Sequence, residues 1–167
     1  MSEQNTTRNE WLAWAAGIID GEGSVMIFRS KPNHRCHRGQ VTPRVQIEMC
    51  SIAVVNKFSE MFGGSTHIIS GKYKGKRRES YRWLMDCGKA VEVLEQIRPW
   101  LVAKAAHADL VIRFWKECRI PRGSNAKLGF SGFRKMTDAE FERRLYFHEE
   151  MKKLQIKGPG QTDEAVN

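Results

Sequence analysis

Cysteine and long apolar runs are scarce in this chain. Its four cysteines, at positions 36, 50, 87 and 118, form no Cys-x-x-Cys pair, and no secretory signal precedes them. This pattern argues against a disulfide framework and predicts free thiols in an intracellular compartment, whether bacterial or phage cytoplasm or an organelle. His34, Cys36 and His37 are expected to be loop residues rather than zinc ligands, because no distant fourth ligand accompanies them. No apolar run approaches the length of a membrane span, so no membrane partner is expected.

Acidic side chains are nearly missing from the middle of the chain. Residues 24–85 contain twelve Lys and Arg against three Glu, and this segment therefore carries the whole formal net charge of +9. Basic and acidic residues balance in the remainder. A positive potential confined to one region predicts a polyanionic partner such as nucleic acid.

Small residues recur near the N-terminus at helical spacing. Ala13, Gly17 and Gly21 are four residues apart, so on a helix they share one face that carries almost no side chain. The backbone of a second helix can approach such a face closely. This stripe predicts a helix–helix contact.

Two acidic residues follow at the end of the same helix. Asp20 and Glu22 flank Gly21 where the helix is expected to stop, so carboxylates and terminal carbonyl oxygens converge there. Oxygen ligands of this kind suit a hard divalent cation. The competing interpretation is an ordinary amphipathic helix that ends in an Asp-Gly turn.

Hydrophobic periodicity predicts the order α-β-β-α-β-β-α-α-α in a single domain of residues 1–155. The expected helices cover 9–20, 52–62, 89–97, 102–117 and 137–154, and the expected strands cover 24–30, 40–49, 66–72 and 79–86. Strict alternation in the second strand gives it one polar face. In the first strand, the sequence does not decide whether Val25 and Ile27 or Met26 and Phe28 face the core. Gly63-Gly64 stops the second helix, a capping box opens the last one, and a polar tail, 156–167, is expected to be disordered.

The nine residues Ala15 to Gly23 resemble the LAGLIDADG motif of homing endonucleases, and the predicted element order resembles the αββαββα core of that family. The resemblance covers about residues 8–120. It implies an α+β fold with a saddle-shaped antiparallel sheet, C-terminal helices, and an intron-homing, mobile-element function. A single motif implies a homodimer that recognises a long pseudo-palindromic site on double-stranded DNA. The implied dimer interface consists of Ala13, Ala16, Gly17, Asp20 and Gly21.

The same resemblance implies metal-dependent phosphodiester hydrolysis that breaks both DNA strands. It makes Glu22 the direct metal ligand beside the main-chain carbonyl of Gly21, with Mg²⁺ the expected ion and Mn²⁺ a substitute. Asp20 is expected to be structural. Lys104 matches the family's basic residue near the cleavage site, where a cation stabilises developing negative charge, although a solvated helix lysine is the alternative.

One position departs from the family. Many relatives carry a polar side chain that orients solvent at the end of the second strand, and this chain has Met49 there. Gln46 or Glu48 substitutes if the alignment shifts by one residue, or the water network is held elsewhere.

Base reading is assigned to Arg44, Gln46, Gln40 and Arg82, because Arg pairs bidentately with guanine and Gln with adenine. Cations in turns are expected to contact phosphate, with solvated loop charges as the alternative. The full set expected to contact DNA is Ser30, Lys31, His34, Arg35, Arg38, Gln40, Thr42, Arg44, Gln46, Glu48, His67, Ser70, Lys72, Lys74, Lys76, Arg77, Arg78 and Arg82.

Two further functions fit the same scaffold, a non-cleaving DNA-binding regulator and an RNA-binding intron maturase. Glu22 favours the enzyme, because a protein that has lost cleavage activity has no chemical reason to keep an acidic residue after Gly21. A sheet rich in Gln and Arg favours DNA over RNA, because the deep, narrow major groove of A-form RNA is closed to side chains.

Overall fold

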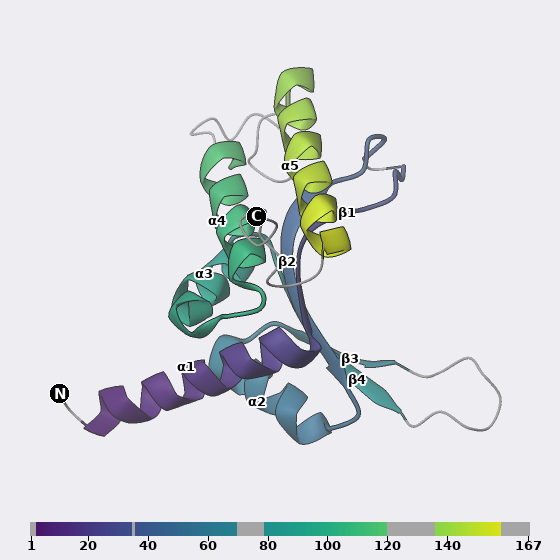
Figure 1. Cartoon of the computed structure of the whole chain (residues 1–167). Coiled ribbons are helices and arrows are strands. Elements are labelled where there is room, and N and C mark those ends of the chain that lie inside the picture. The colour runs from purple at the N-terminus through teal and green to yellow at the C-terminus, as the bar shows by residue number, and fades with distance from the viewer. Residues whose placement is uncertain (1–2, 35, 70–78, 120–135, 158–167) are drawn as a thin grey trace, which may run out of the picture.

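Figure 1 shows the computed structural model, which describes residues 3–34, 36–69, 79–119 and 136–157. Its elements are α1 (Glu3–Glu22), β1 (Gly23–Arg29), β2 (Val41–Met49), α2 (Ile52–Phe62), β3 (Ser65–Ile69), β4 (Ser80–Asp86), α3 (Cys87–Ile97), the 3-10 helix η1 (Arg98–Trp100), α4 (Ala105–Cys118) and α5 (Asp138–Lys157). The predicted order is confirmed, although α1 begins at Glu3 rather than at residue 9. Within these residues, no helix has the length and apolar character needed to cross a membrane.

The four strands form one antiparallel sheet in the order β1-β2-β4-β3. The hairpins β1/β2 and β3/β4 pair internally, and β2 against β4 joins them. Pairing of β2 with β4 begins at Arg44, one residue after Pro43. Pro43, which has no N–H to donate, therefore lies beside β1 alone. The centre of the sheet is therefore a contact between segments that are distant in sequence.

The polar alternation predicted for β2 is confirmed, and the structure also decides the orientation of β1. Val25 and Ile27 are both only 2% exposed, so Met26 and Phe28 lie on the opposite face. Helices α1, α3 and α4 lie to the left of the strands in Figure 1, and β3 and β4 extend to the right. We call the sheet surface on the side of Met26 and Phe28 the open face.

Aromatic side chains fill the core between α1, α2 and β4. The Phe58 ring is fully buried, with its centroid 5.1 Å from that of Trp83 and 5.5 Å from that of Trp14. The indole Nε1 of Trp83 donates to the carbonyl oxygen of Gly63 at 2.6 Å. Gly64 has φ +93°, and a Cβ there would lie 2.7 Å from the same Nε1. The predicted Gly63-Gly64 stop thus ends α2 against β4 at a position that needs glycine.

Helix α5 is attached to the first hairpin and to the end of α4 by side-chain hydrogen bonds. Arg144 is 8% exposed and donates to the carbonyl oxygens of Val41 at 2.9 Å and Cys118 at 2.6 Å. Burial lowers the pKa of Arg144. The imidazole Nδ1 of His148 lies 2.7 Å from the carbonyl oxygen of Ile27. The two bonds of Arg144 satisfy main-chain groups that would otherwise be buried without partners.

The capping box predicted for the last helix is confirmed. The amide N of Thr137 donates to the Glu140 carboxylate at 2.8 Å, and the amide N of Glu140 donates to the Thr137 hydroxyl at 3.3 Å. The helix runs to Lys157, so the predicted end at 154 is too early and the last turn enters the segment expected to be a tail. Residues 158–167 of that segment lie outside the described residues.

We expect Arg144→Ala to lower the free energy of unfolding by about 2–4 kcal/mol, because it removes a packed side chain and leaves two buried carbonyl groups unsatisfied. Urea unfolding followed by circular dichroism measures the change. The neighbouring exposed residue Arg143, which pairs with Glu117 at 2.7 Å, is the control, and Arg143→Ala should leave the midpoint close to that of the wild type. Equal effects of the two substitutions would contradict the structural role of Arg144.

Candidate functional site

The C-terminal end of α1 meets the loop that precedes α4. The carboxylate of Asp20 accepts hydrogen bonds from the amides of Val102 at 2.7 Å, Ala103 at 3.2 Å and Lys104 at 2.8 Å. These N–H groups belong to the three residues that precede α4. A negative charge at this place is favourable because it lies next to the N-terminal end of the helix. This contact holds residues 102–104 outside the helix, which explains why α4 begins at Ala105 and not at the predicted residue 102.

Lys104 makes the reciprocal contact. Its Nζ donates to the carbonyl oxygens of Ile19 at 2.9 Å and Asp20 at 2.6 Å, in the last turn of α1. A cation is favourable at the C-terminal end of a helix, where carbonyl groups lack helical partners. Burial lowers the pKa of Lys104, and the Asp20 and Glu22 carboxylates oppose that shift. The ammonium group is therefore held at one place beside Glu22.

Glu22 differs from Asp20 in having its carboxylate uncommitted. It is the last residue of α1 and is exposed, and the described part of the chain offers it no hydrogen-bond or ion-pair partner. Its carboxylate and the main-chain carbonyl of Gly21 are hard oxygen donors, which suit Mg²⁺ or Ca²⁺. The described residues contain no group of three His, Cys, Asp or Glu side chains that could hold a metal ion. The donors fit such an ion, but one chain supplies few of them.

Four members of the predicted dimer interface remain at least partly exposed, and one does not. Gly17 and Gly21 are exposed, and a Cβ added at either would meet no atom within 4 Å. Ala13 is half-buried on the same face, and Asp20 is half-buried in the contact described above. Ala16 is 0% exposed, so its inclusion was wrong: at helical spacing it turns toward Leu12 and Ile19 and packs in the core of its own subunit.

The open face gathers polar side chains from three strands. The register pairs Arg44 with Asp86, Gln46 with Leu84, Glu48 with Arg82, and Arg82 with His67. Among the residues predicted to contact DNA, those on the open face are Thr42, Arg44, Gln46, Glu48, His67 and Arg82. The structure therefore brings six predicted contact residues onto one surface.

Both arginines of this surface have carboxylate partners from an adjacent strand. The Nε and Nη2 of Arg44 donate to the two carboxylate oxygens of Asp86 at 2.7 and 2.9 Å. Arg82 donates through Nε and Nη2 to one oxygen of Glu48, at 3.1 and 2.6 Å, and the Ser80 hydroxyl donates to the other at 3.1 Å. The guanidinium groups are thus held in place within the free protein.

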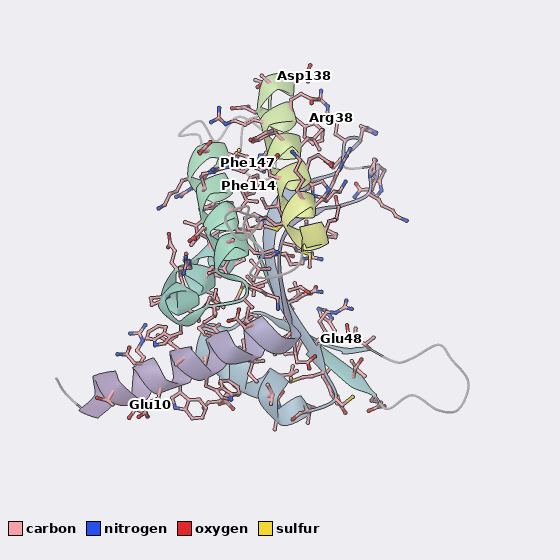
Figure 2. The ribbon with its side chains drawn as sticks, in the orientation of Figure 1. Glu10, Arg38, Glu48, Phe114, Asp138 and Phe147 are labelled. Carbon is pink, nitrogen blue, oxygen red and sulfur yellow. The ribbon has the colours of Figure 1, made fainter. Side chains whose placement is uncertain are left out.

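The other predicted DNA contacts lie at the ends of the hairpins. Ser30 and Gln40 close the β1/β2 connection through two hydrogen bonds of 2.8 Å, and Arg38 forms an ion pair with Asp138 of α5, as Figure 2 shows. Lys31 and His34 are exposed in the same connection. The predicted contacts outside the described residues are Arg35, Ser70, Lys72, Lys74, Lys76, Arg77 and Arg78.

The last residue of β2 is turned away from these groups. Met49 is half-buried and packs against the core, whereas Gln46 and Glu48 lie on the open face. Glu48 is already bound to Arg82, so Gln46 is the more available polar side chain of the two.

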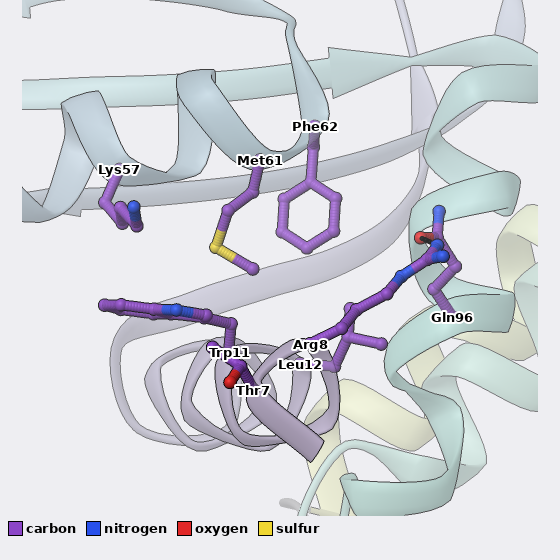
Figure 3. A pocket seen from close by; sticks show the side chains of 8 residues that line it. All are labelled: Thr7, Arg8, Trp11, Leu12, Lys57, Met61, Phe62 and Gln96. Atoms are coloured by element: carbon purple, nitrogen blue, oxygen red, sulfur yellow. Dashed lines mark hydrogen bonds between the residues drawn. The ribbon is translucent and has the colours of Figure 1, made fainter. Parts of the chain in front are cut away.

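A separate groove of about 610 Å³ lies at the other end of α1 (Figure 3). Trp11 and Met61 line it, and the Lys57 ammonium lies 4.4 Å from the centre of the Trp11 ring. Trp11 precedes Glu22 by three turns of helix, so the groove is about 16 Å along α1 from the acidic end. It is not part of the site around Glu22.

Comparison with known proteins gives a consistent result for the fold. No protein-family model matches the sequence, and no curated protein does. The homing endonuclease I-CvuI, solved with its target in the presence of Ca²⁺, superposes with a TM-score of 0.65 at 15% identity, covering 89% of this chain and 83% of that one. The archaeal intron-encoded homing endonuclease I-Vdi141I, solved with DNA, gives 0.59 at 15% identity, covering 96% and 91%. The LAGLIDADG homing endonuclease I-GzeII gives 0.52 at 15% identity, covering 88% and 47%.

This chain has the LAGLIDADG homing endonuclease fold. The α+β class and the antiparallel sheet predicted from the sequence are confirmed. The segment that resembles the family motif lies at the end of α1, and the Asp20–Lys104 contacts connect this helix to the residues that precede α4.

Sequence reasoning missed two residues of the open face, Phe28 and Asp86. Phe28 was left undecided because the inner face of its strand was ambiguous. Asp86 lies opposite Arg44 because β2 pairs with β4, and these strands are not consecutive in the chain. The register of such a pair cannot be predicted from a local sequence pattern.

We expect Asp20→Ala to lower the free energy of unfolding by about 1–2 kcal/mol, because it removes three hydrogen bonds at the start of α4. Glu22→Ala is the matched control from the same helix turn and should leave the unfolding midpoint unchanged. Thermal or urea unfolding compares them. A Glu22→Ala protein as destabilised as Asp20→Ala would mean that Glu22 has a structural partner.

Proposed function

We propose that this chain is a homing endonuclease that binds double-stranded DNA with the open face of its sheet and makes a metal-dependent double-strand break beside Glu22. The observation that carries the proposal is the contrast between two neighbouring carboxylates. Asp20 accepts three hydrogen bonds, while Glu22 is exposed beside the Lys104 cation and has no hydrogen-bond or ion-pair partner within the described residues. A carboxylate left free at a helix end suits a metal ligand.

The fold supports a DNA substrate. I-CvuI and I-Vdi141I, which share it, were solved in complex with DNA. The nine residues of β2 span about 30 Å, close to one turn of B-DNA, and carry Arg44, Gln46 and Thr42 on the open face. Side chains of this kind discriminate bases in the major groove.

Glu22 and the carbonyl oxygen of Gly21 would hold the metal ion, and Mg²⁺ is the ion we propose. When bound, Mg²⁺ supplies an activated water and neutralises negative charge on the phosphate and the leaving oxygen. I-CvuI was solved with Ca²⁺ and also with Mg²⁺. The Lys104 ammonium, fixed on the end of α1, would stabilise negative charge that develops next to Glu22.

We propose a homodimer with the exposed stripe of α1 at its two-fold axis. Gly17 and Gly21 leave open space where side chains would otherwise stand, so two α1 helices can approach closely. The second subunit would supply the second Glu22, and with it the oxygen ligands that one chain lacks. A two-fold dimer presents the same open face twice and would therefore select a pseudo-palindrome.

A non-cleaving DNA-binding regulator is the second candidate. Met49 favours it, because its thioether packs against the core and cannot orient solvent for hydrolysis. Glu22 favours the nuclease, and the cleavage assay below separates the two functions.

We expect Glu22→Gln to reduce cleavage of a randomised duplex library in Mg²⁺ by at least about 100-fold, because even residues that only support a metal ligand contribute 10–100-fold. Binding in Ca²⁺, measured by gel shift, should remain near the wild-type level, because Glu22 lies outside the open face. Glu95→Gln, an exposed acid on α3, is the control and should cleave normally. A wild-type protein that binds selectively and never cuts would establish the regulator instead.

We expect Gly17→Leu to give a folded monomer that does not cut both strands. A Cβ at position 17 meets no atom within 4 Å of its own chain, and leucine replaces a residue of low helix propensity, so the chain itself should not lose stability. Sedimentation reports the dimer and circular dichroism reports the fold. Ala53→Leu, on the exposed side of α2, is the control. A dimeric Gly17→Leu protein would place the interface elsewhere, with α5 around Phe141–Met151 as the next candidate.

A further inference from the structure

Asp86 stands at a position that suits its chemistry, but its carboxylate bonds to a different partner from the usual one. It is the N-cap residue of α3, where a carboxylate ordinarily accepts a hydrogen bond from an amide of the first helical turn. Its side chain makes no such bond. Both carboxylate oxygens instead accept hydrogen bonds from Arg44 on the open face, at 2.7 and 2.9 Å. The helix cap is thus left unused in favour of a contact with one arginine.

A second group fixes the same arginine from another direction. The Cζ of Arg44 lies 3.9 Å from the centre of the Phe28 ring, which is a cation–π contact. Phe28 comes from β1, Arg44 from β2 and Asp86 from β4, so three strands converge on one guanidinium group. The Arg44 side chain is 21% exposed. Contact with the ring and two hydrogen bonds to the carboxylate together restrict the movement of the guanidinium group.

This arrangement leaves one edge of the guanidinium available. Of its five N–H groups, Asp86 engages that of Nε and one of Nη2. Both Nη1 hydrogens and one Nη2 hydrogen remain, and within the described residues they have no hydrogen-bond partner. Two parallel donors on that edge are what the O6 and N7 acceptors of guanine require.

The carboxylate also changes the electrostatics of this position. Arg44 with Asp86, and Arg82 with Glu48, form pairs of no net charge on the open face. Paired cations add little to sequence-independent attraction for phosphate, which depends on net positive charge. A fixed, neutralised arginine contributes to discrimination between bases more than to affinity for any DNA.

We propose that Asp86 and Phe28 are positioning residues that hold Arg44 in the single orientation in which it recognises guanine in each DNA half-site. The inference rests on the proposed DNA-binding function and adds to it two residues that themselves contact no base. Asp86 occupies one edge of the Arg44 guanidinium group, so only the opposite edge can reach a base. The Phe28 ring restricts the movement of that group.

The test is selection of a randomised duplex library by the full-length protein in Ca²⁺, followed by sequencing of the bound DNA. Wild-type protein should select a guanine at one position of each half-site, and Arg44→Ala should lose that preference. Asp86→Asn should lose it at the same position, with discrimination falling about 5- to 100-fold and the other positions unchanged. Binding to random-sequence duplex should stay equal or rise, because a negative charge has been removed.

Three further variants separate positioning from a structural role. Phe28→Leu should weaken the same preference, and Phe28→Tyr should retain it, because only the second keeps a ring over the guanidinium. Asp109→Asn is the matched control, since Asp109 forms the same two-point pair with Arg98, at 2.6 and 2.7 Å, away from the sheet. It should leave every base preference unchanged. Thermal unfolding should show all variants folded.

The outcomes are distinguishable. An Asp86→Asn protein that selects the wild-type sequence would overturn the inference while leaving the proposed function in place. Loss of preference at a position different from the one read by Arg44 would also overturn it, because Asp86 would then contact a base itself. A wild-type protein that selects no sequence would overturn the proposed function and the inference with it.

Discussion

The reciprocal cap between α1 and α4 is the contact on which the candidate catalytic site depends. Asp20 holds the amides of residues 102–104, which lead into α4, and Lys104 holds the carbonyl groups at the end of α1. Each charge thus stabilises the helix end of opposite polarity. Both side chains are fully engaged in this contact. They fix the last turn of α1, and the position of Glu22 at its end is therefore fixed as well. Of the two neighbouring acids, Asp20 is therefore bound within the fold, and Glu22 is left exposed.

Two kinds of positive charge occur in the basic segment of the chain. The arginines of the open face are paired with carboxylates of adjacent strands, at 2.7 Å for Arg44 with Asp86 and 2.6 Å for Arg82 with Glu48. Lys31 in the β1/β2 connection is exposed, by contrast. The net charge that favours a polyanion therefore does not come from the sheet surface. Under the proposed function, charged loops would supply affinity for DNA and paired arginines would supply selectivity.

The sequence alone predicted features that depend on near neighbours along the chain. Gly63-Gly64 stops α2, Thr137 and Glu140 cap α5, and strict alternation marks the polar face of β2. Each signal acts within a few residues, so a single sequence contains all of it. The acidic helix end with its small-residue stripe was visible for the same reason, and together these signals led to the fold class that the solved structures confirm.

Only the tertiary structure decided what depends on contacts between distant segments. It placed Ala16 in the core and Gly17 outside it, turned Phe28 to the open face, and set the register that puts Asp86 beside Arg44. A helix or strand can bury either of two adjacent faces until its packing partner is known, and a shift of one residue in register exchanges the two faces of a strand. The local sequence therefore determined which elements form, and the packing of β2 against β4 determined which side chains act together.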